Sequence, residues 1–179
     1  MLLEQTLPYD YEDMSSMDLF RDENGDGILE VCSLWEPENN NTTKTYQDYI
    51  QVWLQWDGQE GMKAVDAVLE NRAEGYRFYV PLEWMDSLYY DFRTEGTLSW
   101  VDFYYETGTF AFETVFSIAA VDQLTWDTMK LKEDMVVLGN NPINNKIYIA
   151  DIQNQQFNGF QVDASRLISC LQIEGGERK

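Results

Sequence analysis

The run Asp22-Glu23-Asn24-Gly25-Asp26-Gly27-Ile28-Leu29-Glu30 is the stretch whose residue types and spacing are most typical of a metal site. Oxygen-bearing side chains occupy alternate positions at Asp22, Asn24 and Asp26, and a carboxylate closes the run at Glu30. Hard cations such as Ca²⁺ take about six to eight oxygen ligands, which a short, tightly turned loop can supply. The pattern therefore predicts a metal-binding loop.

The loop departs from an EF-hand in two ways. An EF-hand carries a bidentate glutamate at its twelfth position, where this chain has Ser33. The residues after Gly27 also alternate as in a strand, whereas an EF-hand continues into a helix. The acidic residue comes at the ninth position instead, as Glu30. A loop between two strands is therefore expected.

The variant D-x-N-G-D-G-I-x-E-V over residues 22–31 resembles the calcium-binding loop of FG-GAP-type β-propeller repeats, which joins two strands of a blade. The resemblance implies a ligand set of side-chain oxygens, one backbone carbonyl and a closing carboxylate. Its members would be the side chains of Asp22, Asn24 and Asp26, the carbonyl of Ile28, and Glu30. The alternative is a Gly- and Asp-rich surface turn that binds nothing.

The composition excludes several kinds of function. The chain has 179 residues, 32 of them acidic and 12 basic, for a net charge of −20. Binding to nucleic acid needs clustered Lys and Arg, so we expect none, and anionic lipid surfaces would be repelled unless calcium bridged the two. The absence of histidine excludes Ser-His-Asp and Cys-His catalytic arrangements and His-based zinc sites.

The elements around the loop are mostly strands. Strand-like patterns cover residues 28–35, 46–56, 75–81, 88–93, 98–106, 112–121, 135–138 and 146–152. Residues 61–70 fit either a helix or a strand, and helices are predicted to begin after Asp122, running to about Lys132, and after Asp163. We therefore predict an α+β fold, with an antiparallel β-sheet and two or three flanking helices over residues 44–179. Residues 1–43 would form a calcium-loop strand unit and linker.

A wider resemblance covers much of the remaining chain. It rests on four segments, namely Tyr49–Gly58, Gly75–Trp84, Thr125-Trp126 and Val136–Gly139. Their order resembles a C-terminal domain of uncharacterised Gram-positive bacterial secreted or lipid-anchored proteins, in which propeller-like repeats precede the domain. The Gly75–Trp84 segment is also similar to PsbP-like domains. The first resemblance implies an extracytoplasmic protein and no particular activity. We find neither a signal peptide at the start of this chain nor a run long enough to span a membrane.

Aromatic and acidic side chains leave an alternative function open. Trp53 and Trp56 must lie on opposite faces of a regular strand, as must the members of the Tyr89-Tyr90 and Tyr104-Tyr105 pairs, so some rings either pack under a helix or form an exposed patch for sugars or peptides. Carboxylate pairs that could serve a glycosidase are Glu12-Asp13, Asp86 with Asp91, and Glu133-Asp134. Because so many acids are present, such pairs are expected from composition alone.

The function predicted from the sequence is a non-catalytic extracytoplasmic binding or structural module with a calcium-ordered N-terminal loop. The alternative is a carbohydrate-binding or carbohydrate-active domain that works through two carboxylates. The expected partner of the protein is a glycan or a protein at the cell surface. Cys32 and Cys170 could pair, although their apolar neighbours favour buried free thiols.

Overall fold

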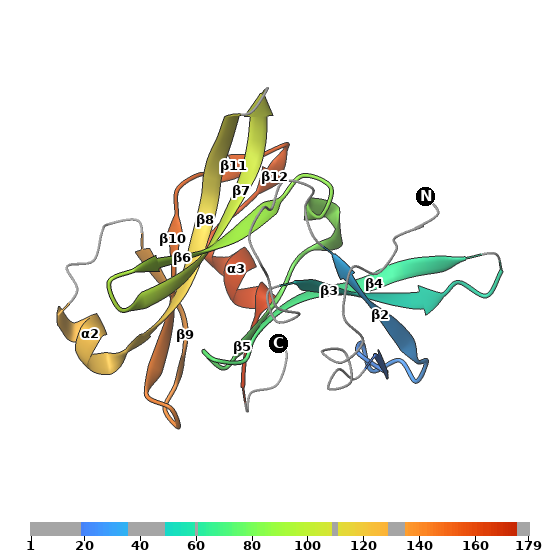
Figure 1. The fold of residues 1–179 in the computed structure, drawn as a ribbon, viewed down its shortest axis with the longest axis horizontal. Helices are drawn as coiled ribbons and strands as arrows, with labels where there is room; N and C mark the ends of the chain where they lie inside the picture. The colour runs from blue at the N-terminus through green and yellow to red at the C-terminus, as the bar shows by residue number, and fades with distance from the viewer. Residues whose placement is uncertain (1–18, 36–48, 60, 109–110, 129–134, 175–179) are drawn as a thin grey trace.

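The computed structural model describes residues 19–35, 49–59, 61–108, 111–128 and 135–174. Two antiparallel sheets pack against each other as a sandwich (Figure 1). The first sheet has the strand order β1 (Phe20–Arg21), β2 (Glu30–Trp35), β3 (Ile50–Trp56), β4 (Met62–Asn71), β5 (Tyr76–Tyr79) and β13 (Leu171–Ile173). The second has the order β6 (Tyr89–Glu95), β7 (Leu98–Gly108), β8 (Ala111–Asp122), β10 (Lys146–Ile152) and β9 (Met135–Asn141).

Short elements connect the two sheets. The 3-10 helix η2 (Leu82–Trp84) follows β5 and leads the chain into the second sheet. After β10, the hairpin β11 (Gln156–Phe157) and β12 (Phe160–Gln161) and the helix α3 (Ala164–Cys170) return the chain to the first sheet at β13. The helix α2 (Gln123–Thr128) lies between β8 and β9. In the part of the chain that the structure describes, no helix is long and apolar enough to cross a membrane.

The predicted α+β class is wrong. Strands make up 60% and helical segments 12% of the described residues, and α2 and α3 are the only α-helices among them. The helix predicted after Asp122 is described only to Thr128, since the rest of its range lies outside the described residues. The fold is an antiparallel, sandwich-like β fold.

The ambiguous segment 61–70 shows why the helix content was overestimated. Residues 62–71 form β4, in which four successive residues, Asp66 to Leu69, are buried. Ala67 and Leu69 face the interior between the sheets, while Val68 packs with Trp53 on the opposite face of the first sheet. A strand covered on both faces gives a continuous apolar run, which periodicity cannot distinguish from a short buried helix.

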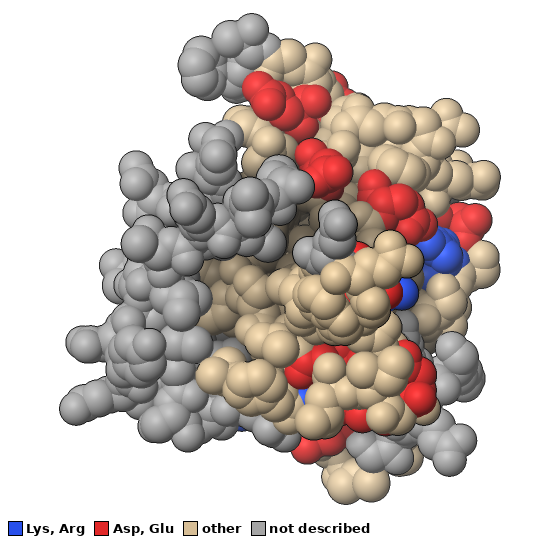
Figure 2. All heavy atoms as spheres, turned by 90° about the vertical axis from the view of Figure 1, so that its right-hand side faces the viewer, with Lys and Arg blue, Asp and Glu red and all other residues tan. Residues whose placement is uncertain are grey.

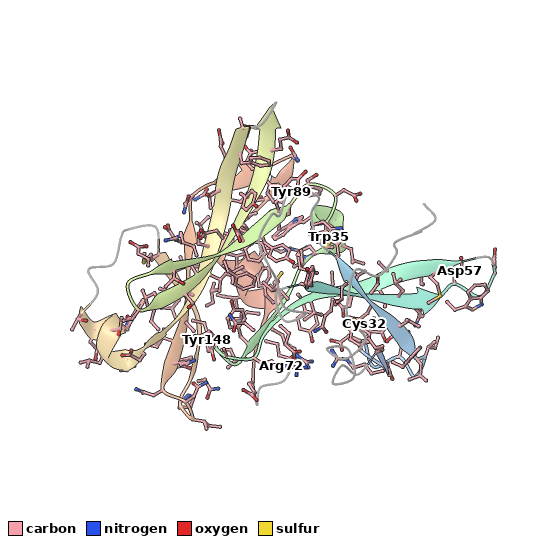
Figure 3. All side chains as sticks on the ribbon, viewed as in Figure 1. Cys32, Trp35, Asp57, Arg72, Tyr89 and Tyr148 are labelled. Carbon is pink, nitrogen blue, oxygen red and sulfur yellow. The ribbon has the colours of Figure 1, made fainter. Side chains whose placement is uncertain are left out.

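Aromatic side chains fill the interior between the sheets. Phe78 of the first sheet packs on Phe103 and Phe116 of the second, with ring centroids 5.3 and 5.7 Å away. Phe103 and Phe116 stack on each other at 4.5 Å. The rings of Tyr76 and Tyr148 make a second contact across the sandwich, with their centroids 5.7 Å apart. Figure 3 labels Tyr148. Burial of these rings is the main source of stability that holds the sheets together.

Candidate metal-binding loop

The candidate site is the loop that joins β1 to β2 at one edge of the first sheet, drawn in blue in Figure 1. The two strands pair with Arg21 opposite Glu30, so the ends of the loop lie side by side. Gly25 and Gly27 have φ angles of 76° and 86°, in the left-handed region that glycine adopts without a steric penalty. The prediction of a tight loop between two strands is therefore confirmed.

Side chains of the predicted ligands fold the loop by capping its own backbone. The Asn24 Oδ1 accepts a hydrogen bond from the Asp26 N–H at 2.9 Å, and the Asp26 Oδ1 accepts one from the Ile28 N–H at 2.8 Å. The Asp22 Oδ2 accepts one from the Gly27 N–H at 2.9 Å. These bonds hold all three oxygen-bearing side chains against the loop.

Three carboxylates converge within the loop. One ligand atom each from Asp22, Asp26 and Glu30 lies within 4.8 Å of the other two, so the group could hold a metal ion. Asp22 and Asp26 are exposed, whereas Glu30 is wholly buried. Of the five predicted ligands, the structure thus brings the three carboxylates together. Asn24 adds a hydrogen bond from its Nδ2 to Asp26 at 3.2 Å, and the Ile28 side chain is exposed.

Glu30 is the unusual member of this group because its carboxylate is buried among neutral donors. Its Oε2 accepts the Glu23 N–H at 2.7 Å, and its Oε1 accepts the Gln55 Nε2–H at 3.1 Å. No Lys or Arg of the described residues forms an ion pair with it. Burying an ionised carboxylate costs free energy that hydrogen bonds repay only in part. A cation at the group would lower this cost, so the donor set suits a hard metal ion.

Gln55 of β3 is a residue of the candidate site that sequence reasoning missed. Its Nε2 also donates to the Asp26 Oδ2 at 2.6 Å, so one amide bridges two of the three carboxylates. This hydrogen bond, followed by the one from the Ile28 N–H, lowers the pKa of Asp26 below its usual value of 3.8. The strand register pairs Val31 with Leu54 and so brings Glu30 beside Gln55. A prediction of the β2–β3 pairing is the signal that could have found it.

Glu23 ties the loop to the rest of the first sheet. Its side chain is only 4% exposed and is ion-paired with Arg21. One of its carboxylate oxygens lies 3.1 Å from the Tyr79 hydroxyl and 4.0 Å from Arg77, both on β5. The Tyr79 hydroxyl also lies 3.0 Å from the amide oxygen of Gln172 on β13. Burial, and next the charge of Glu23, raise the pKa of Tyr79. The loop is thereby connected across the face of the sheet.

Among the charged side chains of the described residues at this end of the molecule, acidic ones predominate. Figure 2 shows Asp and Glu side chains spread over the face at this end of the molecule, where Lys and Arg occupy only a small area.

A pocket of about 340 Å³ opens between the β4–β5 turn and β13, lined by residues that include Arg72, Arg77 and Glu174. Figure 3 labels Arg72 at this turn, apart from Cys32 on β2.

The other residues singled out from the sequence are placed as follows. Cys32 and Cys170 are free thiols. Tyr90 lies in the interior and Tyr89 on the outer face of the second sheet, as strand geometry predicts. Asp86 follows η2 and Asp91 lies in β6. The predicted boundary near residue 43 and the pairs Glu12-Asp13 and Glu133-Asp134 lie outside the described residues.

Comparison with known proteins assigns no family. The chain matches no family model, no curated protein and no solved structure. The resemblances to the FG-GAP loop and to the Gram-positive C-terminal domain therefore stay predictions. The geometry of the loop itself carries the functional argument.

Proposed function

We propose that this chain is a non-catalytic extracytoplasmic binding or structural module in which Ca²⁺ orders the loop between β1 and β2. The observation that carries the proposal is the convergence of the Asp22, Asp26 and Glu30 carboxylates within 4.8 Å. Oxygen ligands of this kind suit Ca²⁺, and Zn²⁺ sites in contrast usually include His or Cys. The Asn24 side chain and the Ile28 carbonyl complete the ligand set that the FG-GAP resemblance implies.

The structural role follows from what the loop contacts. Glu30 begins β2, and Gln55 belongs to β3, so an ion held by the carboxylates would stiffen the junction of three strands. A ligand that binds only the folded chain stabilises it by mass action. At a calcium concentration 100-fold above Kd, this gain is about 2.7 kcal/mol. Calcium would also reduce the repulsion within a chain of net charge −20.

Thermal unfolding with calcium and with a chelator tests the metal. We expect calcium to raise the melting midpoint of the wild type and to leave Asp26→Ala unchanged. Asp127→Ala is the matched control, because Asp127 is an exposed aspartate of α2 outside the loop and its loss changes the charge equally. An equal shift of the melting midpoint by calcium in both variants, or no shift in the wild type, would contradict the proposal. Magnesium at the same concentration measures selectivity.

The extracytoplasmic location is supported by the resemblances of residues 22–31 and of the four downstream segments. Antibody labelling of intact and permeabilised cells that express the natural protein tests it. Labelling of intact cells is expected. Labelling that requires permeabilisation, together with co-fractionation with a cytoplasmic marker, would remove this part of the proposal without affecting the metal test.

A further inference from the structure

A cluster of three aromatic rings lies on the outer face of the second sheet. Tyr89 of β6 and Tyr104 of β7 are register partners, and their rings are nearly parallel, with centroids 5.8 Å apart. Phe112 of β8 stands almost perpendicular to both rings, with centroids 5.5 Å from each. Both tyrosines are half-buried, and Phe112 is 40% exposed. The cluster therefore presents aromatic surface to solvent. Figure 3 labels Tyr89, which lies at one end of β6.

A carboxylate without a cationic partner lies next to this cluster. Asp91 and Asp102 face each other two register pairs along from the two tyrosines, and therefore on the same face of the sheet. Arg93 holds Asp102 through two nitrogens, at 2.6 and 3.2 Å. Asp91 accepts a hydrogen bond from the Phe92 N–H at 2.8 Å, and no cationic side chain of the described ranges pairs with it.

The charge of Asp91 affects the pKa of the neighbouring Tyr104. Burial, and next the negative charge of Asp91, raise the pKa of Tyr104. The carboxylate thus adds negative potential beside rings whose faces are themselves electron-rich. Arg93 already compensates the charge of Asp102, so Asp91 is the carboxylate of this pair that has no cationic partner among the described residues. A cation beside Asp91 would reduce the remaining repulsion between the two carboxylates.

Elsewhere the chain covers aromatic faces with its own arginines. Arg21, Arg93 and Arg166 lie 4.3, 5.4 and 5.8 Å from the ring centroids of Trp53, Trp100 and Trp84, respectively. Within the described residues, no Lys or Arg occupies the same position over the cluster of Tyr89, Tyr104 and Phe112. The cluster therefore has the chemistry of a cation site, and no Lys or Arg of the described residues supplies the cation.

We propose that Tyr89, Tyr104, Phe112 and Asp91 form a docking site for a Lys or Arg side chain of a basic protein segment. The ammonium or guanidinium group would rest on the rings near the Asp91 carboxylate. The net charge of −20 would attract such a segment over a longer range and speed its association. This surface is separate from the loop between β1 and β2, so the proposal does not depend on calcium.

Binding of a short peptide with two arginines, alternating with glycine, tests the site in the presence of chelator. Titration calorimetry measures affinity for the wild type and three variants. Asp91→Asn removes the charge and also a like-charge pair, so folding should be kept. Phe112→Leu removes an exposed ring and keeps apolar bulk. We expect each to weaken binding by roughly two- to fivefold. Asp127→Asn, the charge-matched control, should change it much less.

Each other outcome has a definite meaning. Equal weakening by Asp91→Asn and Asp127→Asn would show general attraction to an acidic protein and overturn the site. So would unchanged affinity in Phe112→Leu, or a wild type that does not bind the peptide. A neutral oligosaccharide that binds equally to the wild type and Asp91→Asn, and competes with the peptide, would assign the rings to sugar stacking and overturn the cation. Circular dichroism of each variant checks that the sheets are intact.

Discussion

Between the two sheets, Phe103 and Phe116 stack 4.5 Å apart and are wholly buried, whereas at the edge of the first sheet three carboxylates converge within 4.8 Å. The first region is held by removal of apolar surface from water, which depends on neither the protonation of a side chain nor a bound cation. The second is held by hydrogen bonds to charged oxygens, whose strength depends on protonation and on any cation nearby.

The two regions hold different parts of the fold together. The aromatic interior lies between the two sheets, and the loop lies where β1, β2 and β3 pair at one edge, so under the proposed function the ion would affect only that edge. If this is right, ions and pH should alter the loop and leave the interior unchanged. Four measurements test the contrast, in order of the size of the expected effect.

Truncation of the interior should have the largest effect. Phe116→Ala removes a ring that contacts Phe78, Trp84 and Phe103, and should lower the free energy of unfolding by about 3–5 kcal/mol. Urea unfolding measures the loss, which should be equal in calcium and in chelator. Phe112→Leu, on the exposed outer face, is the control with a small effect. A loss in Phe116→Ala that depends on calcium would erase the contrast.

Substitution of the buried loop carboxylate should come next. Glu30→Gln places an amide where the Glu23 N–H and the Gln55 Nε2–H both need acceptors, so one donor is left unpaired. The cost should be about 1–3 kcal/mol in chelator, and the stabilisation by calcium should disappear. Chemical unfolding in both conditions measures these quantities. Retention of the full calcium effect would show that Glu30 is not a ligand.

Acid should act through Asp26. Because its folded-state pKa lies below the ordinary 3.8, its ionised form stabilises the fold above that pH, and the contribution is lost as pH falls through the lower folded value. Asp26→Asn should therefore make the stability of the protein depend less on pH below pH 4. Thermal unfolding at a series of pH values in this range would record the difference. An Asp26→Asn curve that matches the wild type would mean that Asp26 makes no folded-state interaction of this kind.

The smallest effect on the fold concerns Cys32, which lies on β2 close in sequence to the loop. Burial, the largest cause, raises the pKa of its thiol from 9.0 to about 12. A rise of this size leaves about a thousandfold less thiolate at neutral pH, so alkylation should be slow until the chain unfolds. Reaction with a thiol reagent in native and denaturing buffer compares the two states. Mass spectrometry separates Cys32 from the second free thiol, Cys170, and rapid labelling of Cys32 in the native protein would contradict the raised pKa.

Local features of the fold were predictable because they depend on neighbours in sequence. The alternation of Lys146 to Ile152 marks β10, and helix starts were correct where an aspartate caps the backbone: the Asp122 Oδ1 accepts the Thr125 N–H at 2.7 Å, and the Asp163 Oδ1 accepts the Arg166 N–H at 2.9 Å. The class was wrong because helix length and the burial of both faces of β4 depend on segments far away in the chain.

The metal loop divides in the same way. The sequence alone determined its turns and the spacing of Asp22, Asn24 and Asp26, since glycines at positive φ and capping side chains act within a few residues. Only the tertiary structure buried Glu30 and placed Gln55 between two carboxylates, because the pairing of β2 with β3 brings together residues 25 positions apart. Strand pairing carries no local signature, and that pairing set the electrostatics of the site.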